Sequence, residues 1–174
     1  MALELTSAGA RRQEIMERLF TDLQVERFNQ LYYQSRADSA KFWITVTNVT
    51  AALAASAAFT GLLKSSGHAG LLTALTAIAA VSAAVSPVLG LEDKYSRLER
   101  AAMGHTIAKD RIWALLRDLK VSELDESHEA RENEISAFRD SLSTLDGKPR
   151  DSLRRKCWET VEAELPADKA WTII

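Results

Sequence analysis

The stretch FWITVTNVTAALAASAAFTGLL, residues 42–63, decides how the rest of the chain is interpreted. It has no charged residue and no proline, and six of its 22 residues are alanine. A second uncharged stretch, AGLLTALTAIAAVSAAVSPVLGL, covers 69–91, and KSSGH at 64–68 separates the two. Runs longer than about 18 apolar residues are typical of helices that cross a membrane. Two alternatives follow: a membrane hairpin, or a hairpin buried on all sides within a soluble protein.

The distribution of charge favours the membrane hairpin. The chain has 22 basic and 24 acidic residues, and Lys64 is the only one of them between positions 42 and 91. Basic residues flank both stretches, whereas the short loop offers only Lys64. Because basic residues mark the cytoplasmic side, both termini are expected in the cytoplasm, and Phe42 and Trp43 are expected at the interface. The net charge of -2 gives no bulk attraction to nucleic acid.

The sequence therefore predicts an all-α integral membrane protein with a two-helix transmembrane hairpin and a cytoplasmic helical stalk or bundle. Residues 1–41 form an N-terminal cytoplasmic helix in this prediction. The hairpin covers 42–91, with spans at 42–63 and 69–91 joined by an outer loop at 64–68. Residues 92–174 form a cytoplasmic helical region.

Helical periodicity continues on both sides of the hairpin. Ile15, Leu19 and Leu23 recur at four-residue spacing in a helix expected over 8–41. A heptad-like seam follows the second span and indicates that this span continues as a helix into the stalk. The seam consists of Leu91, Tyr95, Leu98, Ala102, His105, Ile112, Leu115 and Leu119. Two shorter helices are expected at about 126–145 and 151–164.

Small residues at four-residue spacing in both spans predict close helix packing and a homo-oligomer, with four copies as the working number. Asn48 is the only amide in the spans. Its side chain either forms a hydrogen bond between helices or lines a pore. Pro87 is either a tolerated kink or a hinge. The pore or gate candidates are Thr45, Asn48, Ser56, Phe59 and Pro87.

Charged residues outside the spans supply the remaining candidates. Glu92 and Asp93 lie at the predicted membrane–water interface and would form an acidic ring in an oligomer. Arg150, Arg154 and Arg155 form either a solvated basic face or a ligand site for a phosphate-bearing molecule.

No enzyme is expected from the motifs. The chain lacks a glycine loop of the kind that holds phosphate, and Ser, His and Asp residues show no catalytic pattern. His68, His105 and His128 share no metal-ligand spacing, so neither a metal nor a cofactor is predicted. His105 is expected to be a satisfied core histidine. With Cys157 as the only cysteine, an intrachain disulfide is impossible.

The order of these parts resembles the SLATT family. The similarity rests on RFNQLYYQSRADSAKFW at 27–43, LEDKYSRLERAAMGHTIAKDRIWALLRDL at 91–119 and DGKPRDSLRRKCWE at 146–159, with the two small-residue stretches between the first two. The resemblance implies a bacterial inner-membrane effector of antiphage defence. It also implies gating by a nucleotide signal from a separate nucleotidyltransferase encoded nearby.

Three functional hypotheses follow. The first is a homo-oligomeric pore- or channel-forming membrane effector, gated by that nucleotide signal, which disrupts the membrane and causes growth arrest or cell death. The second is a non-conducting membrane adaptor or structural protein whose cytoplasmic helices recruit a partner. The third is a soluble helical bundle.

Overall fold

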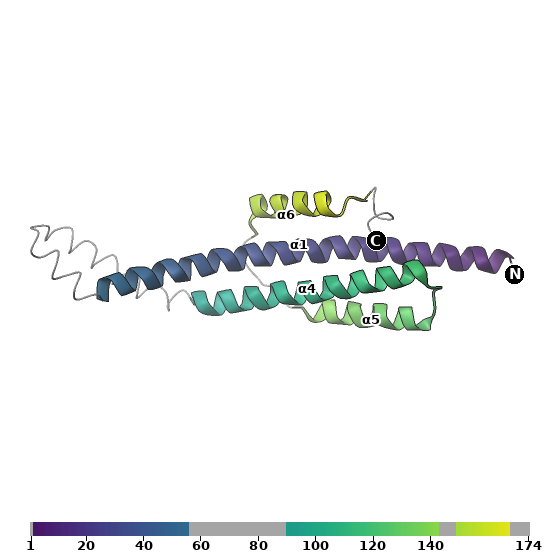
Figure 1. Ribbon diagram of the computed structural model, residues 1–174, viewed down its shortest axis with the longest axis horizontal. Helices are drawn as coiled ribbons and strands as arrows, with labels where there is room; N and C mark the ends of the chain where they lie inside the picture. Colours follow the sequence, from purple (N-terminus) through teal and green to yellow (C-terminus); the bar gives the residue numbers. More distant parts are fainter. Residues whose placement is uncertain (1, 56–89, 143–148, 168–174) are drawn as a thin grey trace, which may run out of the picture. The chain divides into compact units, whose positions relative to one another are not determined.

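A computed structural model describes residues 2–55, 90–142 and 149–167. Helices make up all the regular structure in these ranges: α1 at Ala2–Ala55, α4 at Leu91–Val121, α5 at Glu126–Ser141 and α6 at Asp151–Glu164 (Figure 1). The predicted all-α character is confirmed. Helix α6 has the predicted bounds, whereas α5 ends four residues before the predicted position.

The predicted membrane class is corrected by the structure. Among the described residues, no helix has a segment that is both long and apolar enough to cross a membrane. This finding contradicts the two-span integral membrane protein with cytoplasmic termini, and with it the location in a bacterial inner membrane. The described uncharged part of α1, 42–55, is shorter than the about 18 residues that a span needs. Residues 56–89, which hold the rest of the predicted hairpin, lie outside the described part.

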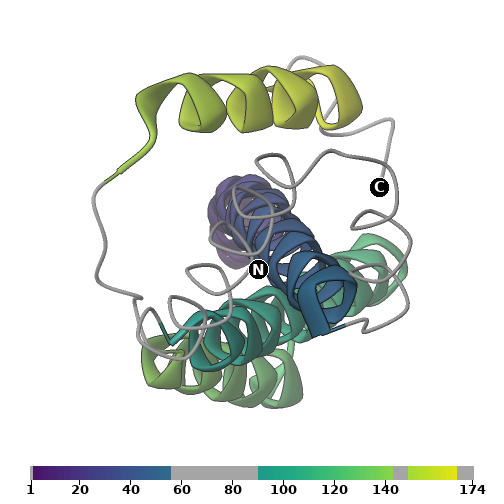
Figure 2. The same ribbon diagram turned by 90° about the vertical axis from the view of Figure 1, so that its left-hand side faces the viewer.

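The chain divides into two compact units. The first contains α1 up to Gln34, α4 from Glu99 onward, α5 and α6. In this unit α1 lies between α6 on one side and α4 with α5 on the other (Figures 1 and 2). The second unit, Ser35–Leu98, contains the rest of α1 and the start of α4.

The core of the first unit is a leucine-rich seam between α1 and α4. The four-residue spacing of Ile15, Leu19 and Leu23 predicted one apolar face of a helix. This prediction is confirmed, since all three side chains are buried. Ile135 on α5 and Leu165, directly after α6, belong to the same core. Its remaining members are Met16, Phe20, Ile112, Leu115, Leu116 and Leu119. Burial of each such side chain contributes about 1.5–3 kcal/mol, so this seam is the main stabilising feature of the unit.

Helix α6 buries an apolar stripe. Its buried residues are Cys157 and Val161, and Leu165 continues the same four-residue spacing just after the helix. An aromatic contact between Phe28 and Trp158, with ring centroids 5.6 Å apart, attaches the helix to α1. A 14-residue helix is marginal in isolation, so α6 depends on these contacts.

In the second unit, helix α4 begins abruptly after Gly90. This glycine has φ 54°, a left-handed backbone conformation that residues with side chains seldom adopt. The Lys94 N–H donates to the Gly90 carbonyl at 2.9 Å and closes the first turn. The predicted uninterrupted helix from the second span into the stalk is therefore wrong at Gly90. In the same unit Phe42 and Trp43 are exposed, and their rings contact each other edge to face.

Leu115→Ala tests the seam. Removing most of a fully buried leucine side chain leaves a cavity, so we expect the free energy of unfolding to fall by about 2–5 kcal/mol. Val121→Ala, at an 85% exposed position of the same helix, should change it by less than about 0.5 kcal/mol. Urea unfolding followed by circular dichroism measures both. Similar losses in the two variants would contradict the assigned core.

Candidate functional site

The predicted pore and gate candidates are only partly within the described residues. Thr45 and Asn48 lie on α1 and are exposed. The Thr45 hydroxyl donates to the Lys41 carbonyl at 3.0 Å. The other three candidates, Ser56, Phe59 and Pro87, lie outside the described residues.

The charged candidates lie at the starts of two helices. Glu92 and Asp93 are exposed in the first turn of α4, where carboxylates interact favourably with the helix dipole. Arg150, Arg154 and Arg155 are exposed at the start of α6. The Arg150 N–H donates to the Tyr32 hydroxyl at 3.4 Å.

A buried ion-pair network joins α1, α4 and α5. The Glu26 side chain is only 4% exposed, and each of its oxygens has a partner. Its Oε2 lies 2.7 Å from His105 Nδ1, and its Oε1 accepts from Arg139 Nε at 2.9 Å. Arg139 also pairs with Asp22 at 2.6 Å, and the Tyr33 ring stacks on His105 with centroids 5.3 Å apart. His105 is thus a satisfied core histidine, as the seam predicted.

Arg139 supplies the positive charge that this network needs. Asp22 and Glu26 are four residues apart on α1, and like charges at that spacing repel each other. Burial lowers the pKa of Arg139, but the hydrogen bonds and charges of Asp22 and Glu26 outweigh burial and raise the pKa above its ordinary value. Both Glu26 oxygens are engaged, so the network acts as a clamp between helices. Within the described ranges, no group of three or more His, Cys, Asp or Glu residues is arranged to hold a metal ion.

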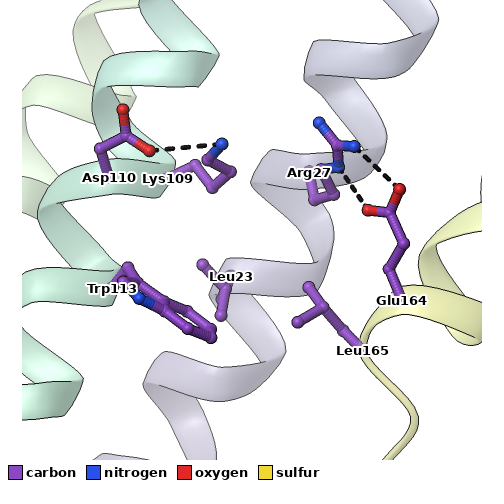
Figure 3. A pocket seen from close by; sticks show the side chains of 7 residues that line it. All are labelled: Leu23, Arg27, Lys109, Asp110, Trp113, Glu164 and Leu165. Carbon is purple, nitrogen blue, oxygen red and sulfur yellow. Dashed lines mark hydrogen bonds and ion pairs between the residues drawn. The ribbon is translucent and has the colours of Figure 1, made fainter. Parts of the chain in front are cut away.

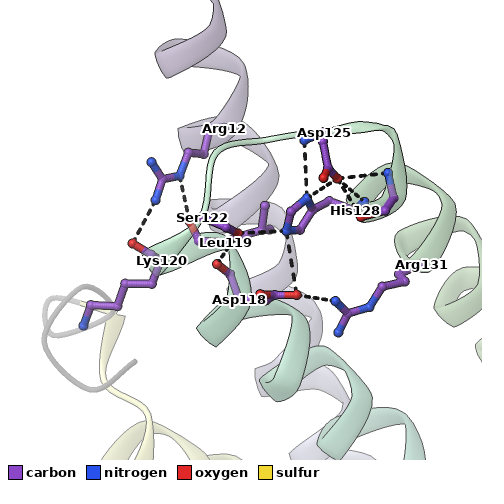
Figure 4. Close-up of polar contacts among 9 residues, drawn as sticks. Arg12, Asp118, Leu119, Lys120, Ser122, Asp125, His128 and Arg131 are labelled. Carbon is purple, nitrogen blue, oxygen red and sulfur yellow. Dashed lines mark hydrogen bonds and ion pairs between the residues drawn. The ribbon is translucent and has the colours of Figure 1, made fainter.

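A second polar cluster closes the turn between α4 and α5 (Figure 4). Asp125 is the N-cap of α5 and accepts from the backbone N–H groups of Ser127 at 3.0 Å and His128 at 3.1 Å. The buried His128 ring lies between Asp125 and Ser122. Its Nδ1 is 2.6 Å from Asp125 Oδ1, and its Nε2 is 3.0 Å from Ser122 Oγ.

Two arginines fasten this turn to its surroundings. Arg12 on α1 donates to the backbone carbonyls of Leu119 at 2.7 Å and Lys120 at 2.9 Å, which ties the end of α4 to α1 (Figure 4). Arg131 on α5 pairs with Asp118 on α4. Asp118 also lies 3.8 Å from His128 Nε2.

The order Asp125–His128–Ser122 resembles the contacts of a serine hydrolase triad. The hydrogen-bond partners argue against that chemistry. Ser122 Oγ donates its single hydrogen to the Asp118 carbonyl at 2.6 Å, so His128 Nε2 donates to Ser122 Oγ and has no free lone pair to act as a base. We therefore interpret the cluster as a helix cap. Its signal in the sequence is the three-residue spacing of Ser122, Asp125 and His128, with histidine in place of the usual Glu or Gln of a capping box.

A pocket of about 330 Å³ lies over α1, between α4 and the end of α6 (Figure 3). This volume is at the lower end of the range for small-molecule sites. Leu23, Leu165 and the indole of Trp113 form its apolar surface, and Figure 3 shows them on three different elements. The polar lining consists of Arg27, Lys109, Asp110 and Glu164.

The charged residues of the pocket form two ion pairs. Arg27 binds the Glu164 carboxylate with two parallel contacts, Nε to Oε2 at 2.7 Å and Nη2 to Oε1 at 2.9 Å. Their hydrogen bond is the main cause that raises the pKa of Arg27 and the main cause that lowers the pKa of Glu164. Lys109 Nζ lies 3.3 Å from Asp110 Oδ1. The four charges of the lining therefore balance.

The pocket and the attachment of α6 share the same residues. Glu164 and Leu165 line the pocket, and both fasten the end of α6 to α1. The Leu165 carbonyl accepts from Gln24 Nε2 at 2.8 Å, next to the ion pair of Glu164 with Arg27. A molecule that enters the pocket therefore touches the contacts that hold α6.

No sequence pattern indicated this pocket. Arg27 and Lys109 are two of the basic residues that flank the uncharged stretches. The predicted anion site at Arg150, Arg154 and Arg155 does not line the pocket. A usable signal is the four-residue spacing of Lys109 and Trp113, which places a cation and an aromatic ring on one face of a helix. Searches of family models, curated proteins and solved structures give no match. The resemblance to the SLATT family stays a prediction.

Arg139→Met tests the buried network. Removal of one partner from a buried ion pair typically costs 3–5 kcal/mol, and we expect about 3 kcal/mol here because Arg139 is 22% exposed and Glu26 keeps His105. Arg11→Met is the matched control, because Arg11 pairs with Glu129 on the surface and should contribute less than about 1 kcal/mol. Urea unfolding at neutral pH measures both. A loss in Arg139→Met no larger than in the control would show that the network does not stabilise the bundle.

Asp125→Asn tests the cap through its pH dependence. The hydrogen bonds from the Ser127 side chain and the His128 backbone lower the pKa of Asp125 from 3.8 to about 2. Because the folded state favours the carboxylate, its contribution is complete above pH 3.8 and is lost as the pH falls to about 2. We expect the parent protein to be more stable than Asp125→Asn near neutral pH, and the difference to shrink across that acid window. Unfolding midpoints against pH measure it, with Asp140→Asn on the same helix as control. A difference that does not vary with pH would contradict this role.

Proposed function

We propose that the protein is a non-catalytic helical adaptor that binds a small ligand and passes the bound state to a partner protein through α6. The ligand occupies the pocket between α1, α4 and the end of α6. The observation that carries this proposal is that Glu164 and Leu165 serve both as pocket wall and as attachment of α6.

The shape and lining of the pocket support ligand binding. Small-molecule sites combine apolar surface with a few polar groups that fix orientation. Here two leucines and an indole supply the apolar surface, and Arg27 and Lys109 supply the cations. Arg150, Arg154 and Arg155, exposed at the start of α6, remain an alternative anion site, but they do not line this pocket.

The attachment of α6 supports a response to the ligand. A ligand shifts a conformational equilibrium only by its differential affinity for the two states. Because the pocket contains contacts that α6 uses for docking, docked and undocked α6 present different sites to a ligand. Since a helix as short as α6 is marginal alone, it depends on its docking contacts, and a ligand that changes those contacts shifts its docking.

The proposal follows the adaptor alternative of the sequence analysis, without its membrane anchor. A conducting pore depends on membrane-spanning segments, and none of the described helices is long and apolar enough to supply one. The nucleotide signal, the homo-oligomer, the neighbouring nucleotidyltransferase, the role in antiphage defence and the absence of enzymatic activity stay predictions.

Hydrogen exchange tests the proposal. The purified chain is mixed separately with adenosine, adenosine 5′-monophosphate, indole-3-acetate, tryptophan and glucose. We expect at least one probe to change the exchange of α6, residues 151–164, while α5 changes little. Trp113→Leu should weaken binding of that probe about 2- to 12-fold, because an aromatic contact contributes about 0.5–1.5 kcal/mol.

Trp43→Leu is the matched control, because Trp43 is exposed and does not line the pocket. It should bind the same probe as the parent does. Binding that does not depend on Trp113, or exchange that changes in no part of α6, would contradict the proposed function.

A further inference from the structure

The charges of the pocket restrict the kind of ligand it takes. Resting on the proposed function, we infer that the ligand is a small aromatic molecule with one carboxylate or phosphate group. Its anionic group takes the place of the Glu164 carboxylate on Arg27, and its ring lies on Trp113. Binding therefore releases the end of α6 instead of fixing it.

Arg27 is prepared to accept an anion other than Glu164. Its Nη1 donates to Gln30 Oε1 at 2.9 Å, a contact within α1 that does not involve α6. This third contact holds the guanidinium plane when Glu164 leaves. The Nε and Nη2 groups then present the same two parallel donors to another carboxylate or to a phosphate.

Lys109 adds a second cation on the other side of the pocket. Its partner Asp110 is the next residue in the chain, lies 3.3 Å away and is largely exposed to water. The charge of Lys109 also contributes, as the smallest of the causes, to the lowered pKa of Glu164. An anion at the position of the Glu164 carboxylate is therefore attracted by both Arg27 and Lys109, whereas a cationic ligand is repelled by both.

The Glu164 carboxylate is an exchangeable occupant of this position. Its side chain is 43% exposed, and water screens an ion pair of that exposure until it contributes little to stability. A ligand anion gains the same contacts with Arg27. A ligand that also covers the indole of Trp113 gains apolar contact that Glu164 does not make.

The aromatic part of the ligand is indicated by the apolar side of the pocket. Leu23, Leu165 and the Trp113 indole line the pocket together (Figure 3), and its volume of about 330 Å³ admits a flat ring beside them. The Arg117 guanidinium lies 5.5 Å from the centroid of the Trp113 ring and helps to hold its orientation. A small inorganic anion fills only the charged part of this pocket.

Two variants of the Arg27–Glu164 ion pair distinguish displacement of Glu164 by a ligand from a purely structural role of the pair. We expect Glu164→Gln to bind adenosine 5′-monophosphate and indole-3-acetate about tenfold more tightly than the parent, because the internal competitor is lost. Arg27→Gln should bind both about tenfold more weakly. An ion pair with a purely structural role would make the two variants change in the same direction. Isothermal titration calorimetry measures the affinities.

Matched probes test each part of the ligand. Adenosine has the ring without the anion, and inorganic phosphate has the anion without the ring, so both should bind more weakly than adenosine 5′-monophosphate. Comparison of that nucleotide with indole-3-acetate distinguishes phosphate from carboxylate as the preferred anion. Hydrogen exchange of α6 should be faster in the parent with ligand, and also in Glu164→Gln without ligand.

The inference is overturned if Glu164→Gln binds these anions no more tightly than the parent, or if α6 exchanges more slowly on binding. In either case, binding of any probe that depends on Trp113 would still support the proposed function. If no probe binds in a Trp113-dependent way, both the proposed function and the inference are overturned. Should Glu164→Gln fail to fold, Arg27→Lys decides. It keeps the charge but loses the two parallel donors, so it should weaken binding of adenosine 5′-monophosphate more than binding of adenosine. Equal weakening of the two would overturn the inference.

Discussion

The apolar seam between α1 and α4 is the interaction on which the rest of the first unit depends. Leu19 and Leu23 on α1 share one buried core with the leucines of α4. Because side chains four residues apart on a helix lie on one face, this packing fixes how the polar residues of the two helices face each other. Glu26 then meets His105, and Arg12 reaches the carbonyls at the end of α4. Leu23 belongs to the seam and also lines the pocket, so the pocket is built directly on the core.

Two kinds of ion pair in this unit have different roles because their exposure differs. Glu26 is almost fully buried, and separating it from Arg139 would leave a charge in a medium that cannot solvate it. That pair therefore has to persist in the folded state. Glu164 can leave Arg27 and be hydrated at once, because it is partly exposed. The same pair of residue types thus forms a permanent clamp in one place and an exchangeable contact in the other.

The sequence was informative where local periodicity decides the structure. The four-residue spacing of Ile15, Leu19 and Leu23 predicted the buried face of α1, and the bounds of α6 were predicted correctly. The membrane class was inferred from composition over 42–91. Within the described residues the uncharged part of α1 covers only 42–55, and no helix there is long and apolar enough to cross a membrane.

The pocket was beyond the reach of sequence reasoning for a different reason. Arg27 and Glu164 are 137 positions apart, and Gln24 and Leu165 are 141 apart. No periodic pattern relates residues at such separations, because their meeting depends on how α6 returns to α1. The arginines at 150, 154 and 155 suggested a site because they are close in the sequence, yet they line no part of this pocket. Tertiary packing brought together single charges that looked unremarkable in the sequence.

The position of α6 outside the seam allows its docking to change without unfolding of the rest of the unit. Cys157 and Val161 are buried against their surroundings but are not members of the core that joins α1, α4 and α5, and only Leu165 takes part in it. Elements with few contacts to the main core open at a lower free energy than the core itself. The seam, the Glu26 network and the Asp125 cap all lie among α1, α4 and α5. Loss of the contacts at Glu164 and Leu165 leaves those three helices connected, so α6 is the one described helix whose docking can change while the bundle that forms the pocket floor stays folded.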